Sequence, residues 1–235
     1  MMRPEAQDRA SSMNPLAKAI RANERRVTRF HTERGQLMPW AAWLRLPAAL
    51  WARAISRTGD TPWMVPAAVS YLAHIMRPDW NVFEFGSGSS TLWYAVRSGR
   101  VTSVEHDPRW HDLVQQRLCE RAIRNCDLRL VDLKGFPKCM EGCQDNTFDL
   151  VIVDGSEEGE GDRLSCVGAS APKVKRGGYL VLDDCDQAAY RGVDALLVGW
   201  AVRRFVGVKP YPLMAVETSV YQRPLNPGGS SRGPV

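Results

Sequence analysis

Residues 82–91 read VFEFGSGSST, and this short stretch decides the expected fold. Its first residues predict a β-strand, and the glycines and serines that follow predict a tight turn into a helix. A strand, a glycine-rich turn and a helix in this order are typical of folds that bind nucleotides. The third glycine of the dinucleotide fingerprint is absent, so the stretch alone leaves the ligand open.

Strands and helices alternate along the rest of the chain. Beyond the strand at 81–85, strands are predicted at 100–106, 126–131, 148–154, 179–184, 202–208 and 218–224. Regular alternation favours an α/β fold with a doubly wound, mostly parallel sheet covered by helices on both faces. Ligands of such sheets bind at the carboxyl ends of the strands, so the residues that directly follow each strand are the informative ones.

The composition fits one globular domain with an N-terminal extension. The chain has 235 residues, of which 44% are apolar and 24% are charged, and its net charge is +5. This mild excess of positive charge favours acidic partners only weakly, and no nucleic-acid-binding module is recognisable. No signal peptide or membrane-spanning run is evident, and six scattered cysteines fit reduced thiols, so a cytoplasmic location is expected.

The first 62 residues are expected to form a helical extension. A helix is predicted over 15–30, and the arginines of residues 19–35 are interpreted as the solvated face of a helix; they are Arg21, Arg25, Arg26, Arg29 and Arg34. The tryptophan-rich segment 38–55 is expected to pack on the core or to cover a substrate pocket as a lid, in preference to forming an interfacial helix, because only Arg45 and Arg53 could contact lipid phosphates. Residues 63–224 are expected to form the main domain, and the composition of residues 225–235 predicts a disordered tail.

Acidic residues end several of the predicted strands. Glu105 lies nineteen positions after Gly86, where a carboxylate can accept hydrogen bonds from both ribose hydroxyls of a nucleoside. Glu84 and Asp154 point to a ligand with positive charge, because they would repel a pyrophosphate. S-adenosylmethionine carries an ammonium, a sulfonium and a ribose but no phosphate, so it fits better than a nicotinamide dinucleotide.

The pieces VFEFGSGSST, VTSVEHD, FDLVIVDGS and KRGGYLVLDD lie in this order between Trp63 and Pro224. Together they resemble the Rossmann-like, class I, S-adenosylmethionine-dependent methyltransferases. FEFGSGSSTLWYA and SVEHDPRWH are also similar to an uncharacterised bacterial subgroup that acts on small molecules. The resemblance implies a seven-stranded sheet with an antiparallel last strand and transfer of a methyl group to oxygen or nitrogen of a small-molecule acceptor.

The resemblance also implies a set of cofactor contacts. The loop from Glu84 to Gly88 would hold the methionine end, Glu105 the ribose, and Asp132 the adenine amino group. The expected cofactor-binding residues are Glu84, Gly86, Ser87, Gly88, Thr91, Glu105, His106, Asp132 and Asp154.

Asp154 and Asp184 are the expected catalytic residues, with Asp183 and His106 as further candidate bases. Acids at such strand ends hold magnesium in enzymes like catechol O-methyltransferase, where an asparagine completes the set. Cys185 stands where that asparagine is expected, and a thiol is a poor ligand for a hard cation. Magnesium is therefore the less favoured alternative, and no metal ligand is assigned.

Other functions stay open. A nicotinamide-dependent oxidoreductase is the enzymatic alternative, and a non-catalytic Rossmann-like binding module is the alternative of another class. Arg163 is a candidate to bind an acidic group of the substrate, an oligomer is possible in principle, and the sequence does not identify the acceptor.

Overall fold

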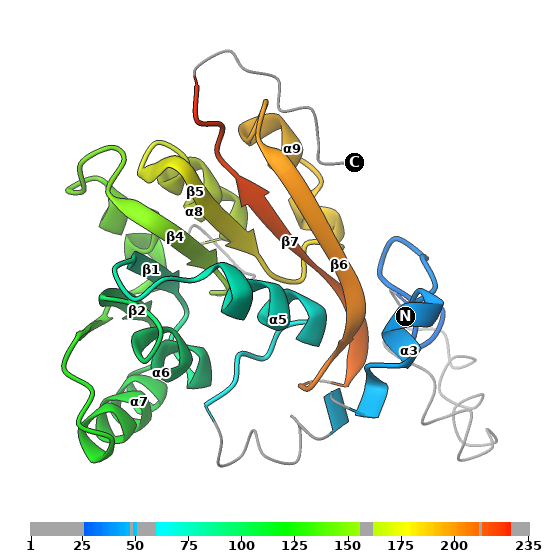
Figure 1. The fold of residues 1–235 in the computed structure, drawn as a ribbon, viewed down its shortest axis with the longest axis horizontal. Helices are drawn as coiled ribbons and strands as arrows, with labels where there is room; N and C mark the ends of the chain where they lie inside the picture. The colour runs from blue at the N-terminus through cyan, green and yellow to red at the C-terminus, as the bar shows by residue number, and fades with distance from the viewer. Residues whose placement is uncertain (1–25, 48, 51–59, 156–161, 212, 227–235) are drawn as a thin grey trace, which may run out of the picture.

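A seven-stranded sheet forms the centre of the molecule (Figure 1). The structure is a computed structural model that describes residues 26–47, 49–50, 60–155, 162–211 and 213–226. The strand order is β3-β2-β1-β4-β5-β7-β6. The strands are β1 (Asn81–Phe85), β2 (Arg100–Glu105), β3 (Cys126–Leu130), β4 (Phe148–Val153), β5 (Val174–Leu182), β6 (Ala201–Lys209) and β7 (Met214–Gln222). The expected doubly wound, mostly parallel sheet is confirmed.

Strand direction and order create one switch point in the sheet. The strands from β3 to β5 run parallel, whereas β7 pairs antiparallel with both β5 and β6. From β1 the chain first builds outward through β2 and β3, and then returns to place β4 on the other side of β1. The connections after β1 and β4 therefore leave in opposite directions, which opens a crevice at the carboxyl ends of these two strands.

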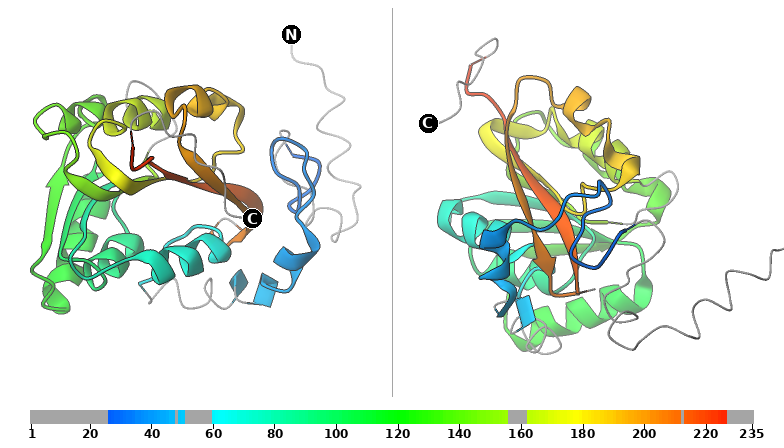
Figure 2. Two further views of the ribbon diagram at one scale, coloured as in Figure 1. Left: turned by 45° about the horizontal axis from the view of Figure 1, so that its top comes forward. Right: turned by 90° about the vertical axis from the view of Figure 1, so that its right-hand side faces the viewer.

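Helices cover both faces of the sheet (Figure 2). One layer contains α5 (Pro66–Ile75), α6 (Ser89–Ala95) and α7 (Pro108–Glu120), and the other contains α8 (Arg163–Ser170) and α9 (Val193–Leu196). Short 3₁₀ turns are η1 (Leu133–Gly135), η2 (Pro137–Met140) and η4 (Ala188–Tyr190). Local sequence sets several helix starts, because Asp107 caps α7, Asp162 caps α8, and proline occupies the first turn of α5 and α7.

The hydrophobic core lies on both sides of the sheet because the central strands are buried on both faces. In β4, Val151 and Val153 pack into the cluster beneath α8, whereas Leu150 and Ile152 pack into the cluster that holds Leu72 of α5. All four side chains are at most 1% exposed. The period of two along β4 thus supplies both halves of the core.

The predicted helix over 15–30 is wrong at its C-terminal end. Residues 15–25 lie outside the described residues, and residues 26–30 form bends and a turn. The backbone carbonyl of Arg29 accepts a hydrogen bond from Ala215 N at 2.7 Å, next to β7. Arg26 is buried, donates to the Ala215 carbonyl and pairs with Asp186 at 3.0 Å, so it is not on a solvated helix face. Long-range pairing with the start of β7 replaces the local helix.

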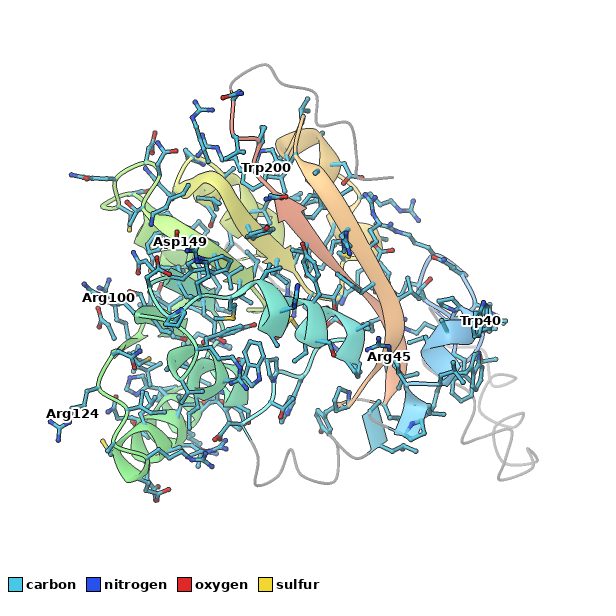
Figure 3. The ribbon with its side chains drawn as sticks, viewed as in Figure 1. Trp40, Arg45, Arg100, Arg124, Asp149 and Trp200 are labelled. Atoms are coloured by element: carbon cyan, nitrogen blue, oxygen red, sulfur yellow. The ribbon has the colours of Figure 1, made fainter. Side chains whose placement is uncertain are left out.

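The tryptophan-rich segment lies beside the edge strand β6. Its helix α3 (Trp40–Trp43) packs there, with Arg45 toward β6 and Trp40 directed away from the sheet (Figure 3). Met38 and Ala49 are 2% and 1% exposed and share a hydrophobic cluster with Val208 and Ala215, so the segment packs on the core there, whereas Trp40 is 77% exposed. Trp51 lies outside the described residues, and the lid stays a prediction. The predicted tail from 227 onward also lies outside the described residues. None of the described helices is long and apolar enough to cross a membrane.

Candidate active site

A cleft with a volume of about 360 Å³ lies at the carboxyl ends of the central strands, where the fold predicts a ligand. The loops after β1, β2 and β4 contribute to it, together with residues that follow β5 and end β6. Its lining residues are Trp63, Gly86, Ser87, Gly88, Ser89, Ser90, Glu105, His106, Asp107, Trp110, Asp154, Gly155, Arg163, Asp184, Lys209 and Tyr211. Most of the residues predicted from the strand ends are therefore brought together.

Glu105 joins the first two loops of the cleft. One carboxylate oxygen accepts hydrogen bonds from the backbone N–H and the hydroxyl of Ser87, both at 3.0 Å. The other accepts from the N–H groups of His106 and Asp107 at 2.8 and 3.0 Å. These contacts occupy about four acceptor positions, which is the capacity of a carboxylate. A ribose hydroxyl must share this carboxylate or displace a donor, and the Ser87 hydroxyl is the donor that can rotate away.

Glu84 lies behind the glycine loop instead of in the cleft. It is 1% exposed and is not among the lining residues. Its oxygens accept hydrogen bonds from the hydroxyls of Ser90, Thr91 and Ser103 at 2.5, 2.5 and 2.7 Å. Glu84 and Thr91 therefore hold the first turn of α6 in place through hydrogen bonds. Direct contact of Glu84 with a cofactor ammonium, as the resemblance implies, does not fit this arrangement.

Burial raises the pKa of Glu84 to about 7, although the three hydroxyl donors lower it. An acid whose pKa is higher in the folded state loses stabilising effect as pH rises from its unfolded pKa of 4.5 to about 7. When the pH rises from 5 to 8, we expect the free energy of unfolding of Glu84→Gln to increase by about 2–3 kcal/mol relative to that of the unchanged protein. Urea unfolding at both pH values measures this difference, and an equal change in both proteins would contradict it.

Three aromatic rings form a wall of the cleft that the sequence did not reveal. Trp63 lies 6.1 Å from Trp110 and 5.1 Å from Tyr211 between ring centroids. The Trp110 indole donates a hydrogen bond to the Ser87 carbonyl at 2.6 Å, so it also fixes the glycine loop. The three residues come from separate parts of the chain, before α5, in α7 and after β6. A planar group can stack on such a wall.

Three carboxylates meet at the floor of the cleft. Asp154, Asp183 and Asp184 each place an oxygen within 4.8 Å of the other two. Asp154 follows β4 and its side chain is 28% exposed, whereas Asp183 and Asp184 follow β5 and are buried. Asp154 is therefore the carboxylate of this group that a ligand can reach most easily.

Two cations already engage these carboxylates. The Lys209 ammonium lies 2.5 Å from both oxygens of Asp184 and 3.6 Å from Asp183. The Arg163 guanidinium lies 3.0 Å from Asp154 and 3.5 Å from Asp184, and it donates to the backbone carbonyls of Gly155 and Asp183 at 2.9 and 2.6 Å. The suggestion that Arg163 binds an acidic substrate group is therefore weakened, because its donors have partners within the protein.

The two buried aspartates have opposite pKa shifts. Burial, followed by the charge of Asp184, raises the pKa of Asp183 to about 8. Burial acts in the same direction on Asp184, but the charges of Lys209 and Arg163 outweigh it and lower the pKa of that carboxyl. Asp184 is thus held as an ion-paired carboxylate, which makes it a poor proton acceptor. This environment argues against the predicted catalytic role of Asp184.

The floor of the cleft does not fit a resident magnesium ion. The oxygens are spaced for a cation, but ammonium and guanidinium groups occupy their contacts. The sequence analysis disfavoured magnesium because Cys185 was aligned with the expected asparagine, and this alignment was wrong by one residue. Asp184 is the third member of the group, whereas the Cys185 thiol donates to the backbone of Glu217 at 3.2 Å.

Two further predicted contacts are placed by the structure. Asp132 does not line the cleft; it is exposed and accepts a hydrogen bond from Gly135 N at 2.7 Å as the cap of η1. His106 does line it, and its Nδ1 lies 3.0 Å from the Glu105 carboxylate. The adenine contact proposed for Asp132 therefore lacks support from this geometry.

Comparison with known proteins agrees with the fold and the cleft. Residues 83–185 match the sequence family described as "Methyltransferase domain". No curated protein matches the chain. This span contains the end of β1, the glycine loop, Glu105 and the three aspartates, so the match covers the strand ends that build most of the cleft.

Similar solved structures include three methyltransferases. The O-methyltransferase TomG of Streptomyces achromogenes, solved with S-adenosylmethionine, is 17% identical, with a TM-score of 0.58 over 76% of this chain and 89% of that one. An O-methyltransferase of Bacillus cereus is 14% identical, with a TM-score of 0.57 over 77% and 90%. The N-methyltransferase NodS of Bradyrhizobium japonicum is 15% identical, with a TM-score of 0.51 over 68% and 93%.

At these identities the structures establish a shared fold, and the family match adds the sequence evidence. Residues 83–185 thus match a methyltransferase domain, and the fold around them is shared with methyltransferases, one of which was solved with S-adenosylmethionine.

Proposed function

We propose that this protein transfers a methyl group from S-adenosylmethionine to an oxygen or nitrogen of a small-molecule acceptor. The observation that carries the proposal is the position of Asp154, which lines one cleft together with the glycine loop and Glu105. Glu105 marks the nucleoside side of this cleft, and Asp154 marks a reaction side that holds a reachable carboxylate.

The residues of the cleft would bind the cofactor, orient the acceptor and remove its proton. S-adenosylmethionine supplies an electrophilic methyl group on a sulfonium and leaves as a neutral thioether. Ser87, Gly88 and Glu105 would hold the cofactor by backbone and carboxylate contacts. Asp154 would orient the acceptor and take the proton that an O–H or N–H nucleophile loses. Most of the rate enhancement would come from alignment of the two reactants.

The acceptor half of the cleft suits a compact and partly apolar molecule. Trp63 and Tyr211 provide apolar surface beside the charged floor of Asp154 and Lys209. The volume of about 360 Å³ lies in the range of small-molecule sites. O- and N-methyltransferases are both among the similar structures, which supports either type of nucleophile.

A nicotinamide-dependent oxidoreductase fits the cleft less well. Glu105, Asp107 and Asp154 line it, and a pyrophosphate entering there would meet these carboxylates. The start of α6 lacks the third glycine of the dinucleotide fingerprint. A non-catalytic binding module would need neither a reachable carboxylate nor a second half of the cleft.

We expect S-adenosylhomocysteine, but not NAD, to stabilise the protein against heat. At a concentration about 100 times the Kd, binding adds about 2.7 kcal/mol, or roughly 5–10 °C in Tm for a chain of this size. Differential scanning fluorimetry with each ligand measures the shift. Radiolabelled S-adenosylmethionine with a panel of small hydroxyl and amine acceptors then tests turnover. A shift with NAD alone would overturn the proposal, and cofactor binding without turnover of any acceptor would favour the binding module.

A further inference from the structure

Lys209 is the last residue of β6, and its position in the sequence does not predict that it contacts the three carboxylates. Its ammonium nevertheless reaches the floor of the cleft from the edge of the sheet. The residue is 7% exposed, and its Nζ contacts both oxygens of Asp184 at 2.5 Å and one oxygen of Asp183 at 3.6 Å. Lys209 also lines the cleft, so the same ammonium can face a bound molecule.

Charge balance explains why these groups coexist. Three carboxylates within 4.8 Å of one another repel each other strongly in a buried site. Arg163 compensates Asp154 and Asp184, and Lys209 compensates Asp183 and Asp184. Opposite charges raise the pKa of the Lys209 ammonium above its usual value although burial lowers it, so the group stays charged. Two cations for three acids leave little charge to attract a divalent ion.

We propose that Lys209 is a built-in cation of the acceptor site and takes the place that a divalent metal ion would otherwise occupy among Asp154, Asp183 and Asp184. The ammonium keeps Asp183 and Asp184 in position and presents positive charge to the cleft. For the proposed methyl transfer, on which this consequence rests, it stabilises negative charge on an acceptor oxygen without a metal. Lysine suits this role because its ammonium is a compact point charge with three donors.

The first test asks whether removal of the ammonium opens a metal site. Lys209→Met keeps most of the side-chain volume but removes the charge. We expect this variant to bind Mn²⁺ at least about tenfold more tightly than the unchanged protein, because oxygen ligands with uncompensated charge favour hard cations. Isothermal titration calorimetry and Mn²⁺ electron paramagnetic resonance measure the affinity without any methyl transfer.

Controls identify the site of binding. Lys209→Arg retains the positive charge and should not gain Mn²⁺ affinity, and Lys209→Met with Asp184→Asn should lose the gain. Lys175→Met is a matched control, because Lys175 pairs with Asp149 at 2.8 Å, outside the cleft. Should Lys209→Met fail to fold, addition of Mn²⁺ during refolding is expected to rescue it, and EDTA to prevent this rescue.

Two outcomes overturn the inference. Tight Mn²⁺ binding by the unchanged protein would show that Lys209 does not exclude the metal. Failure of Lys209→Met to gain Mn²⁺ affinity, or of Mn²⁺ to rescue its folding, would show that the ammonium does not occupy a cation position. Neither result depends on S-adenosylhomocysteine binding, measured separately, so failure of this inference is distinguishable from failure of the proposed function. In the unchanged protein, EDTA should alter neither Tm nor S-adenosylhomocysteine affinity.

Discussion

Gly86→Val is expected to lower the free energy of unfolding by about 2–5 kcal/mol, a large part of the stability of a typical domain. Gly86 has a φ of +85°, which side chains with a Cβ rarely adopt. A Cβ at this position would lie 2.6 Å from the backbone oxygen of Asp154. Valine therefore adds backbone strain and a clash with the adjacent β4 connection. Urea unfolding measures the loss.

Three alanine variants separate the two causes. Gly35→Ala should show backbone strain alone, because Gly35 has a φ of +76° and a Cβ added there would meet no atom within 4 Å. Gly142→Ala should change little, since its φ lies outside the left-handed region and its surroundings are open. Gly86→Ala should cost more than either. Equal losses for Gly86→Ala and Gly35→Ala would contradict the clash with Asp154.

The close approach of Gly86 to Asp154 gives a different reason for the first glycine of VFEFGSGSST. The sequence suggests that Gly86 lets the backbone approach a ligand, whereas the structure shows that the closest obstacle is the chain after β4. The two connections pass close together because β1 and β4 are neighbours at the switch point of the sheet. Gly86 thus serves the fold that builds the cleft, and its substitution should affect stability before it affects binding.

The sequence predicts the fold well because its signals are local. Strand-turn-helix units such as VFEFGSGSST need only neighbouring residues to be recognised. The carboxyl ends of parallel strands gather at one edge, so Glu105 and Asp154 could be placed in a common cleft without coordinates. Strand position does not determine which acid faces a ligand and which one holds a helix start through hydroxyl groups, as Glu84 does.

The other parts of the site depend on distant segments. Lys209, Trp63 and Tyr211 come from the two ends of the domain, and no local pattern connects them with the loops after β1 and β2. Arg26 illustrates the same limit, because its partner Asp186 is 160 positions away. A run of arginines predicts a solvated helix, whereas pairing across the fold buries one of them.

Asp154→Asn is the second change with a large expected effect. We expect kcat for methyl transfer to fall by about 10²–10⁴-fold, the usual contribution of a general base, with little change in S-adenosylhomocysteine affinity. The asparagine side chain keeps the size of the aspartate and can still accept a hydrogen bond from Arg163, which contacts the present carboxylate at 3.0 Å. The fold should therefore persist. Steady-state kinetics with an acceptor from the screen, together with calorimetry for S-adenosylhomocysteine, measure both effects.

Asp149→Asn, within the strand β4 that Asp154 follows, provides the matched control. Asp149 pairs with Lys175 at 2.8 Å and does not line the cleft, so this variant should keep its turnover. Equal loss of cofactor affinity and kcat in Asp154→Asn would assign the residue to the cofactor half of the cleft. A raised KM with unchanged kcat would mean that Asp154 only binds the acceptor. A fall in kcat alone would assign proton removal to Asp154, because Lys209 contacts both oxygens of Asp184 and Asp183 is fully buried.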